Sequence, residues 1–144
     1  MKNTFLLAVD GSSGSEKAID FVIDRAQRGG AKVIVAYVIE WSPYSFNTPE
    51  ENEQRHKRRE EELARANSTI LEPVAAKLKK AGLDVETVVD HGNPARTVVE
   101  LADKYDAAQI FIGRTGETGL KTLLFGSVVA NLVQTSTVPV TVVP

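Results

Sequence analysis

The sequence predicts an α/β fold, an open, doubly wound, Rossmann-like sheet of five parallel strands with helices on both faces. Short apolar runs alternate with longer amphipathic segments along the whole chain, which is the pattern of consecutive strand–helix–strand units. Apolar runs without polar alternation, such as residues 4–9, indicate strands covered on both faces. The expected strand order is 3-2-1-4-5, which places a crevice between strands 1 and 4, outside their carboxyl ends.

The first half of the chain is expected to hold two strands, residues 4–9 and 32–39, and two helices. A capping box at Ser13–Glu16 opens the first helix, which Gly29-Gly30 ends. Its apolar stripe is Ala18, Ile19, Val22 and Ala26.

A second, much longer helix is expected from Glu50 to Gly82. Its start projects into solvent and its end docks on the sheet through an apolar stripe, Leu63, Ala66, Ile70, Val74 and Leu78. Pro73 is where this helix would kink or divide. The charged stretch 50–62 is interpreted as a solvated face, with a docking surface for a partner as the alternative.

The second half of the chain completes the alternation. A turn at His91–Pro94 allows Asn93 to cap a helix whose first residue is Pro94 and whose buried side is Val98, Leu101, Ala102 and Tyr105. A last helix, from Ser127, would bury Val129, Leu132 and Val133. The remaining strands are expected at residues 83–89, 107–112 and 138–143.

Composition narrows the function. At 144 residues the chain is expected to form one domain, residues 1–144, with a sizeable core. A net charge of −2 gives no basic field for nucleic acid, and the absence of cysteine excludes disulfide and thiolate chemistry. The sequence has two histidines, His56 and His91, and no apolar run long enough to span a membrane. We therefore expect a soluble, cytoplasmic protein without a His-centred catalytic site.

A glycine-rich segment follows the fourth strand. It contains Gly113, Gly116 and Gly119, and reaches Gly126-Ser127 where the helical pattern resumes. Glycines allow a backbone to approach a ligand closely, and the N–H groups of a loop and a helix start bind anions. The spacing fits neither a Walker A loop, because Leu120 separates Gly119 from Lys121, nor the G-x-G-x-x-G dinucleotide fingerprint.

The spacing Gly113-x2-Gly116-x9-Gly126-Ser127 resembles the nucleotide-binding signature G-2x-G-9x-G-S/T of the universal stress protein family. The resemblance covers the whole chain. It implies a regulatory protein of the stress response that binds ATP, or another adenine nucleotide such as AMP or cyclic AMP, and forms homodimers through its last strand. Here that strand would pair through Val138, Val140 and Val142. The resemblance does not identify the regulatory protein partner.

Asp10, at the end of strand 1, is the first candidate ligand residue. Its carboxylate can accept hydrogen bonds from ribose hydroxyls, as the resemblance implies; the alternative is a helix cap or a turn aspartate. The resemblance further implies that the backbone of Val9 and Val38 meets the adenine and that the glycine segment lines the phosphates. The full candidate set is Ala8, Val9, Asp10, Val38, Ile112, Gly113, Arg114, Thr115, Gly116, Gly126, Ser127, Val128 and Val129.

Several side chains keep two interpretations. Arg114 departs from the family pattern, in which serine is common; it either pairs with phosphate or points to solvent or a partner subunit. Ser127 either caps its helix or contacts phosphate. His91 is interpreted as a surface turn residue. The aromatic residues Trp41, Tyr44 and Phe46 either pack their loop down or form a lid over the cleft.

No constellation for strong catalysis is apparent, so we expect a binding protein rather than an enzyme, with at most slow ATP hydrolysis or autophosphorylation. Bound Mg²⁺ or Mn²⁺ would bridge the phosphates, with ligands largely from nucleotide and water. The alternative function is a nucleotide-free structural module that binds a partner as a dimer. An adenylating enzyme is disfavoured because the chain lacks a Ser-Gly-Gly loop and a His-x-Gly-His motif.

Overall fold

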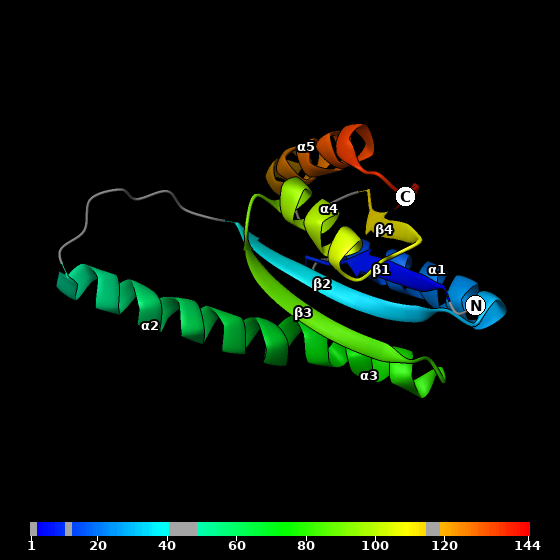
Figure 1. Ribbon diagram of the computed structural model, residues 1–144, viewed down its shortest axis with the longest axis horizontal. Helices are drawn as coiled ribbons and strands as arrows, with labels where there is room; N and C mark the ends of the chain where they lie inside the picture. Colours follow the sequence, from blue (N-terminus) through cyan, green and yellow to red (C-terminus); the bar gives the residue numbers. More distant parts are fainter. Residues whose placement is uncertain (1–2, 11–12, 41–48, 115–118) are drawn as a thin grey trace.

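The computed structural model describes residues 3–10, 13–40, 49–114 and 119–144. Its centre is a five-stranded sheet in the order β3-β2-β1-β4-β5, with every neighbouring pair parallel (Figure 1). This confirms the fold class and strand order that the sequence predicts. The strands are β1 (Thr4–Ala8), β2 (Lys32–Glu40), β3 (Val85–Gly92), β4 (Gln109–Gly113) and β5 (Val140–Val143).

Successive side chains of the central strands point to opposite faces of the sheet and contribute to two separate hydrophobic cores. Leu7 is fully buried in the core beneath α1 (Ser13–Gly29) and α3 (Glu72–Lys80). Leu6 is fully buried on the other face, beneath α4 (Pro94–Lys104) and α5 (Gly119–Thr135), which Figure 1 shows on one side of the sheet. Because both faces are covered, β1 needs no polar residue and appears in the sequence as an uninterrupted apolar run.

Helix α1 buries the predicted stripe of Ala18, Ile19, Val22 and Ala26, each at most 2% exposed. The helix ends where predicted. Gly30 takes a φ of 66°, and the N–H of Ala31 returns to the carbonyl of Ala26 at 3.1 Å. The side chain of Ser13, which the predicted capping box requires, lies outside the described part of the chain, as do Trp41, Tyr44 and Phe46.

The predicted long helix is one helical stretch in three parts: α2 (Pro49–Ala66), a π-helical turn (Asn67–Leu71) and α3. Pro73 lies in the first turn of α3, directly after the π turn. A proline has no N–H to donate to the preceding turn, so the helix is divided close to where the sequence indicates. The hydroxyl of Thr69 donates to the carbonyl of Arg65 at 2.6 Å within this irregular turn.

The π turn also shifts which side chains face the sheet. It adds a residue to one turn, so the next buried residue after Ala66 is Leu71. The buried residues further along the helix are Ala75 and Leu78. The predicted stripe residues Ile70 and Val74 are only partly buried, because the prediction assumed an unbroken 3.6-residue period. Figure 1 shows the start of α2 extending beyond the sheet, as its charged sequence predicts.

The largest differences from the predicted boundaries concern β3, β5 and α5. Strand β3 continues past residue 89 to Gly92, and β5 begins at Val140, so Val138 precedes the strand. Helix α5 begins at Gly119 rather than at Ser127. The leucines and lysine between these positions have high helix propensity, and a single interior glycine costs only about 1 kcal/mol. Val133, predicted to be buried, is 51% exposed, whereas its neighbour Leu132 is fully buried.

Candidate functional site

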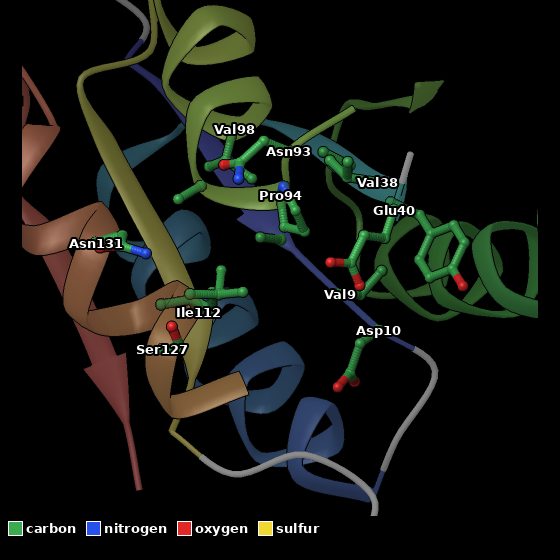
Figure 2. Close-up of a pocket in the computed structure, with 15 residues that line it drawn as sticks. Val9, Asp10, Val38, Glu40, Asn93, Pro94, Val98, Ile112, Ser127 and Asn131 are labelled. Carbon is green, nitrogen blue, oxygen red and sulfur yellow. The ribbon is translucent and has the colours of Figure 1, made fainter. Parts of the chain in front are cut away.

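A pocket of about 390 Å³ opens at the carboxyl ends of β1, β2 and β4, on the face covered by α4 and α5 (Figure 2). This is the crevice at which the strand order reverses, where doubly wound sheets place their ligands. The pocket brings together residues from β1, β2, β4, α4 and α5. Its lining residues are Ala8, Val9, Asp10, Ala36, Tyr37, Val38, Glu40, Asn93, Pro94, Ala95, Val98, Ile112, Ser127, Val128 and Asn131.

Asp10, two residues beyond β1, is held in a defined orientation by Ser15. The hydroxyl of Ser15 donates to Asp10 Oδ1 at 2.8 Å, and the Asp10 backbone N–H donates to that hydroxyl at 3.3 Å. Ser15 is only 4% exposed, so the first turn of α1 anchors the aspartate from inside the protein. The carboxylate is therefore both a structural element of the β1–α1 connection and a pocket-lining acid.

Apolar side chains form the floor of the pocket. Ala8 and Ile112 belong to the core beneath α4 and α5, and Val38 packs against that core at its rim. Val9 lines the pocket as well, but it belongs to the core on the opposite face of the sheet, and its N–H donates to the carbonyl of Ala36 at 2.9 Å. The N–H of Val9 is thus already used within the sheet.

The start of α4 forms another wall. Asn93 is the N-cap of this helix, with φ −73° and ψ 123°, and its side-chain oxygen accepts the N–H of Arg96 at 3.0 Å. Pro94 follows at the first helical position, where its missing N–H has no consequence. The predicted cap is confirmed, and the same residues also line the pocket.

The α5 side of the pocket differs from the prediction. Ser127 and Val128 line the pocket, but both lie well inside α5, as does Val129. Backbone N–H groups inside an α-helix donate to the carbonyl four residues earlier. The predicted helix start at Ser127 is therefore wrong, and so is the interpretation in which Ser127 caps the helix. Ser127 contributes its side chain.

The glycine segment is described in part. Gly113 is buried as the last residue of β4. Arg114 is exposed, and its N–H donates to the carbonyl of Val143 at 2.7 Å, which extends the β4–β5 ladder. Thr115 and Gly116 lie outside the described residues. Gly126 lies within α5.

Sequence reasoning missed part of the lining, although two signals could have found it. Side chains two residues apart on a strand share a face, so Val38 implies Ala36 and Glu40. Residues four apart on a helix share a face, so Ser127 implies Asn131. The missed lining residues are Ala36, Tyr37, Glu40, Asn93, Pro94, Ala95, Val98 and Asn131.

Within the described ranges, no group of three or more His, Asp or Glu side chains is arranged to hold a metal ion. The ring of His91 lies 3.5 Å from the carboxylate of Glu62, so it bridges the end of β3 to α2. It is 15% exposed, which makes it less of a surface residue than the sequence suggests. Among the described helices, none is both long and apolar enough to cross a membrane.

A doubly wound parallel sheet with a pocket at its switch point defines a protein of the Rossmann-like fold class. The chain belongs to the universal stress protein family, whose sequence model matches residues 1–144. It is 32% identical over 138 residues to the universal stress protein MJ0531 of Methanocaldococcus jannaschii, covering 96% of this chain and 79% of that one. It is 30% identical to the universal stress protein YxiE of Bacillus subtilis, with 99% of each chain covered.

Solved structures agree with this assignment. The hypothetical protein MJ0577 of Methanocaldococcus jannaschii superposes with a TM-score of 0.80 at 26% identity, covering 99% of this chain and 96% of that one. A universal stress protein in complex with cAMP superposes with a TM-score of 0.67 at 28% identity, covering 99% and 96% of the two chains. Nucleotide binding therefore occurs within the family on the same fold.

Proposed function

We propose that this protein is a regulatory protein that binds an adenine nucleotide in the pocket between β1 and β4. The observation that carries the proposal is the convergence of Asp10, Val38 and Ser127 on one pocket, supported by the cAMP complex of a relative with the same fold. A volume of about 390 Å³ is within the range of small-molecule sites. In this arrangement the sugar lies at Asp10, the base lies over Val38, and the phosphates point towards Ser127.

ATP is the nucleotide we propose first, with AMP and cyclic AMP as the other adenine ligands. Their shared chemistry, a base and a ribose, matches the apolar floor and the acid of the pocket. A longer phosphate tail would extend towards Arg114, which is exposed next to β4. Any accompanying Mg²⁺ or Mn²⁺ would take most of its ligands from phosphate and water.

The proposed activity is binding and not catalysis. Asp10 is the acid next to the sugar, and its described partner is the hydroxyl of Ser15, an arrangement that orients a carboxylate for hydrogen bonding. A bound nucleotide would stabilise the folded protein by mass action, by about 2.7 kcal/mol at 100 times its dissociation constant. Such a stabilised state is what a regulatory partner would recognise.

Calorimetric titration and thermal unfolding of nucleotide-stripped protein test the proposal. We expect saturable binding of ATP, AMP or cAMP together with a rise in Tm. Asp10→Asn retains an acceptor for Ser15 but loses the charge, and should weaken binding about tenfold, because hydrogen bonds to charged groups contribute about 1.5–3 kcal/mol. Asp84→Ala, at an exposed acid just before β3, is the control and should bind like wild type.

The same titration decides the alternative function. A structural module with an empty pocket would give no heat and no change in Tm at millimolar concentrations of all three nucleotides. That result would refute nucleotide binding and leave partner binding as the function of the chain.

We further propose that the protein forms a two-fold dimer through β5. This strand is at one end of the sheet order and pairs only with β4 among the described strands. The carbonyls of Pro139 and Val143 accept hydrogen bonds from the N–H groups of Ile110 and Arg114 on the β4 side. Because backbone groups alternate in direction along a strand, the N–H and C=O groups of Val140 and Val142 point away from β4. An exposed edge of this kind is a template for pairing, and antiparallel pairing with a second copy would satisfy it.

Val142→Pro tests the dimer. It removes one outward N–H without removing a hydrogen bond to β4, so light scattering should show a monomer of unchanged fold. Thr141→Pro is the matched control, because it removes an inward N–H and should impair folding instead. A wild-type protein that is monomeric at micromolar concentration would contradict the proposed dimer.

A further inference from the structure

A second pocket, of about 510 Å³, opens on the face of the sheet that α1 covers, opposite the face of the pocket between β1 and β4. Phe5 of β1 and Phe111 of β4 line it from the sheet, and Phe21 lines it from α1. It shares no lining residue with the pocket between β1 and β4. A volume of this size is within the range of small-molecule sites. The structure therefore offers a second pocket, separate from the first.

An aromatic cluster forms the apolar part of this second pocket. The ring centroids of Phe5 and Phe111 lie 5.0 Å apart at an interplanar angle of 56°, and those of Phe21 and Phe111 lie 6.0 Å apart at 48°. Phe111 is only 1% exposed, so the cluster is anchored in the core. Tilted rings of this kind present both faces and edges to a further ring. The cluster is therefore suited to a planar, apolar ligand.

Two arginines of α1 give the second pocket its charge. The guanidinium carbon of Arg25 lies 4.8 Å from the ring centroid of Phe21. A guanidinium group that stacks on a ring keeps its N–H groups, which lie in its own plane, for an anion. Arg28 lies three residues further along the same helix face, and its Nε is 3.2 Å from Asp24 Oδ1. Two guanidinium groups and one carboxylate leave one net positive charge, which matches a singly charged anion.

A polar pair on the sheet adds a hydrogen-bond donor. Gln109 and Thr141 both line the second pocket, and the side-chain amide of Gln109 donates to the hydroxyl of Thr141. A hydroxyl that accepts one hydrogen bond still has its own hydrogen to donate. Among the described residues that line this pocket there is no acid. Its polar groups are therefore arranged to receive an acceptor, and an anionic one in particular.

We propose that the second pocket binds a small aromatic carboxylate. The ring of the ligand packs against the phenylalanine cluster, and its carboxylate accepts hydrogen bonds from Arg25, Arg28 and the hydroxyl of Thr141. Hydrogen bonds between a guanidinium group and a carboxylate are about twice as strong as those between neutral groups, so charge and shape are recognised together. This site does not depend on the proposed nucleotide binding.

Benzoate and its uncharged analogue benzamide, which have nearly the same shape, test the proposal. Each is titrated into ¹⁵N-labelled protein and followed by NMR. Benzoate should shift the backbone amide signals of Gly29 and Thr141, which line the second pocket, and should bind at least about tenfold more tightly than benzamide. Arg25→Gln, at an exposed position of α1, should weaken benzoate about tenfold and change benzamide by less than about twofold.

The matched control is Arg58→Gln, which removes an exposed guanidinium of α2 outside the second pocket and should bind benzoate like wild type. Two substitutions of Thr141 test the hydroxyl. Thr141→Val keeps the volume but loses the donor and should weaken benzoate about tenfold, whereas Thr141→Ser keeps the donor and should stay within about twofold of wild type. Circular dichroism checks that each variant is folded.

Four results would overturn the proposal. They are no saturable binding of benzoate at millimolar concentration, equal affinity for benzoate and benzamide, an Arg25→Gln variant that binds benzoate like wild type, and amide shifts that are largest at Asp10 and Ser127. An excess of AMP should leave benzoate bound, because the two pockets are separate, and displacement would also contradict the assignment. None of these results with benzoate decides whether the protein binds a nucleotide, so the two proposals fail separately.

Discussion

Gly92 is the position where a single methyl group should disturb both the fold and the pocket. It ends β3 with a φ of 156°, a conformation that residues with a side chain rarely adopt, at a cost of about 1–3 kcal/mol. A Cβ at this position would lie 2.5 Å from the hydroxyl oxygen of Thr97. Thr97 is only 5% exposed within α4, so relieving the overlap would cost about another 1–3 kcal/mol. Gly92→Ala should therefore lower the free energy of unfolding by about 2–6 kcal/mol.

Equilibrium urea unfolding followed by circular dichroism measures this loss. Gly29→Ala is the matched control, because a Cβ there meets no atom within 4 Å. That control should change stability by less than about 1 kcal/mol. The double variant Gly92→Ala/Thr97→Ala separates the two costs, because it removes the overlap and leaves the strained φ. It should be less destabilised than the sum of the single variants by at least about 1 kcal/mol.

Two results would contradict this reasoning. A Gly92→Ala variant within about 0.5 kcal/mol of wild type would show that the β3–α4 turn adapts freely. Strict additivity in the double variant would show that the Thr97 hydroxyl is not the obstacle.

Three other perturbations have defined outcomes. Leu132→Ala, at a fully buried position of α5, should cost about 3 kcal/mol in urea unfolding. Asn93→Ala should lower the free energy of unfolding by about 1 kcal/mol through loss of the α4 cap, whereas Asn93→Asp keeps an oxygen for the N–H of Arg96. Equal stability of these two variants would contradict a capping role. Hydrogen bonds to Asp20 and Glu16 raise the pKa of Lys77. These ion pairs should add about 0.5 kcal/mol to the free energy of unfolding, since the groups are exposed. This stabilisation is fully present below pH 10.5 and is lost as the pH rises through the raised pKa of the folded state. The stability difference between wild type and Lys77→Met should therefore shrink as the pH rises above 10.5, and a difference that grows there would refute the assignment.

The sheet could be predicted because its signals are local and strong. An uninterrupted apolar run such as residues 4–9 has few alternatives to a strand covered on both faces, and β1 has this environment. The Asn93-Pro94 pair predicted the start of α4 because a cap followed by a proline satisfies the first turn. Once strands and connections alternate, handedness leaves few topologies, and the strand order follows.

The helix boundaries were less predictable because they depend on competition between neighbouring segments. Gly119 and Gly126 suggested a loop, but the residues between them favour a helix, and α5 begins at Gly119. The π turn before Pro73 could not be located to a residue, because a missing N–H can be accommodated by a kink, a break or an extra residue. That extra residue moved burial from Ile70 to Leu71.

The site was predicted where topology fixes it and missed where it depends on side-chain pairing. Asp10 and Ser127 meet in one pocket because the ends of β1 and β4 are neighbours in the sheet. Ser15 was not identified as the partner of Asp10, since a serine in a first helical turn usually suggests only a cap. Glu40 was missed because an acid at the end of a strand usually faces water.

Two polar groups of the pocket, the carboxylate of Asp10 and the amide of Asn93, are held by hydrogen bonds within the protein. Ser15 fixes the carboxylate of Asp10, and the cap of α4 fixes the amide of Asn93, so binding need not order these groups. The bonds that fix them also support the fold, since one anchors α1 to β1 and the other starts α4. A ligand that matches these fixed positions gains the full value of its hydrogen bonds. The orientation of these two pocket groups is therefore a consequence of how the strands β1 and β3 pass into the helices that follow them.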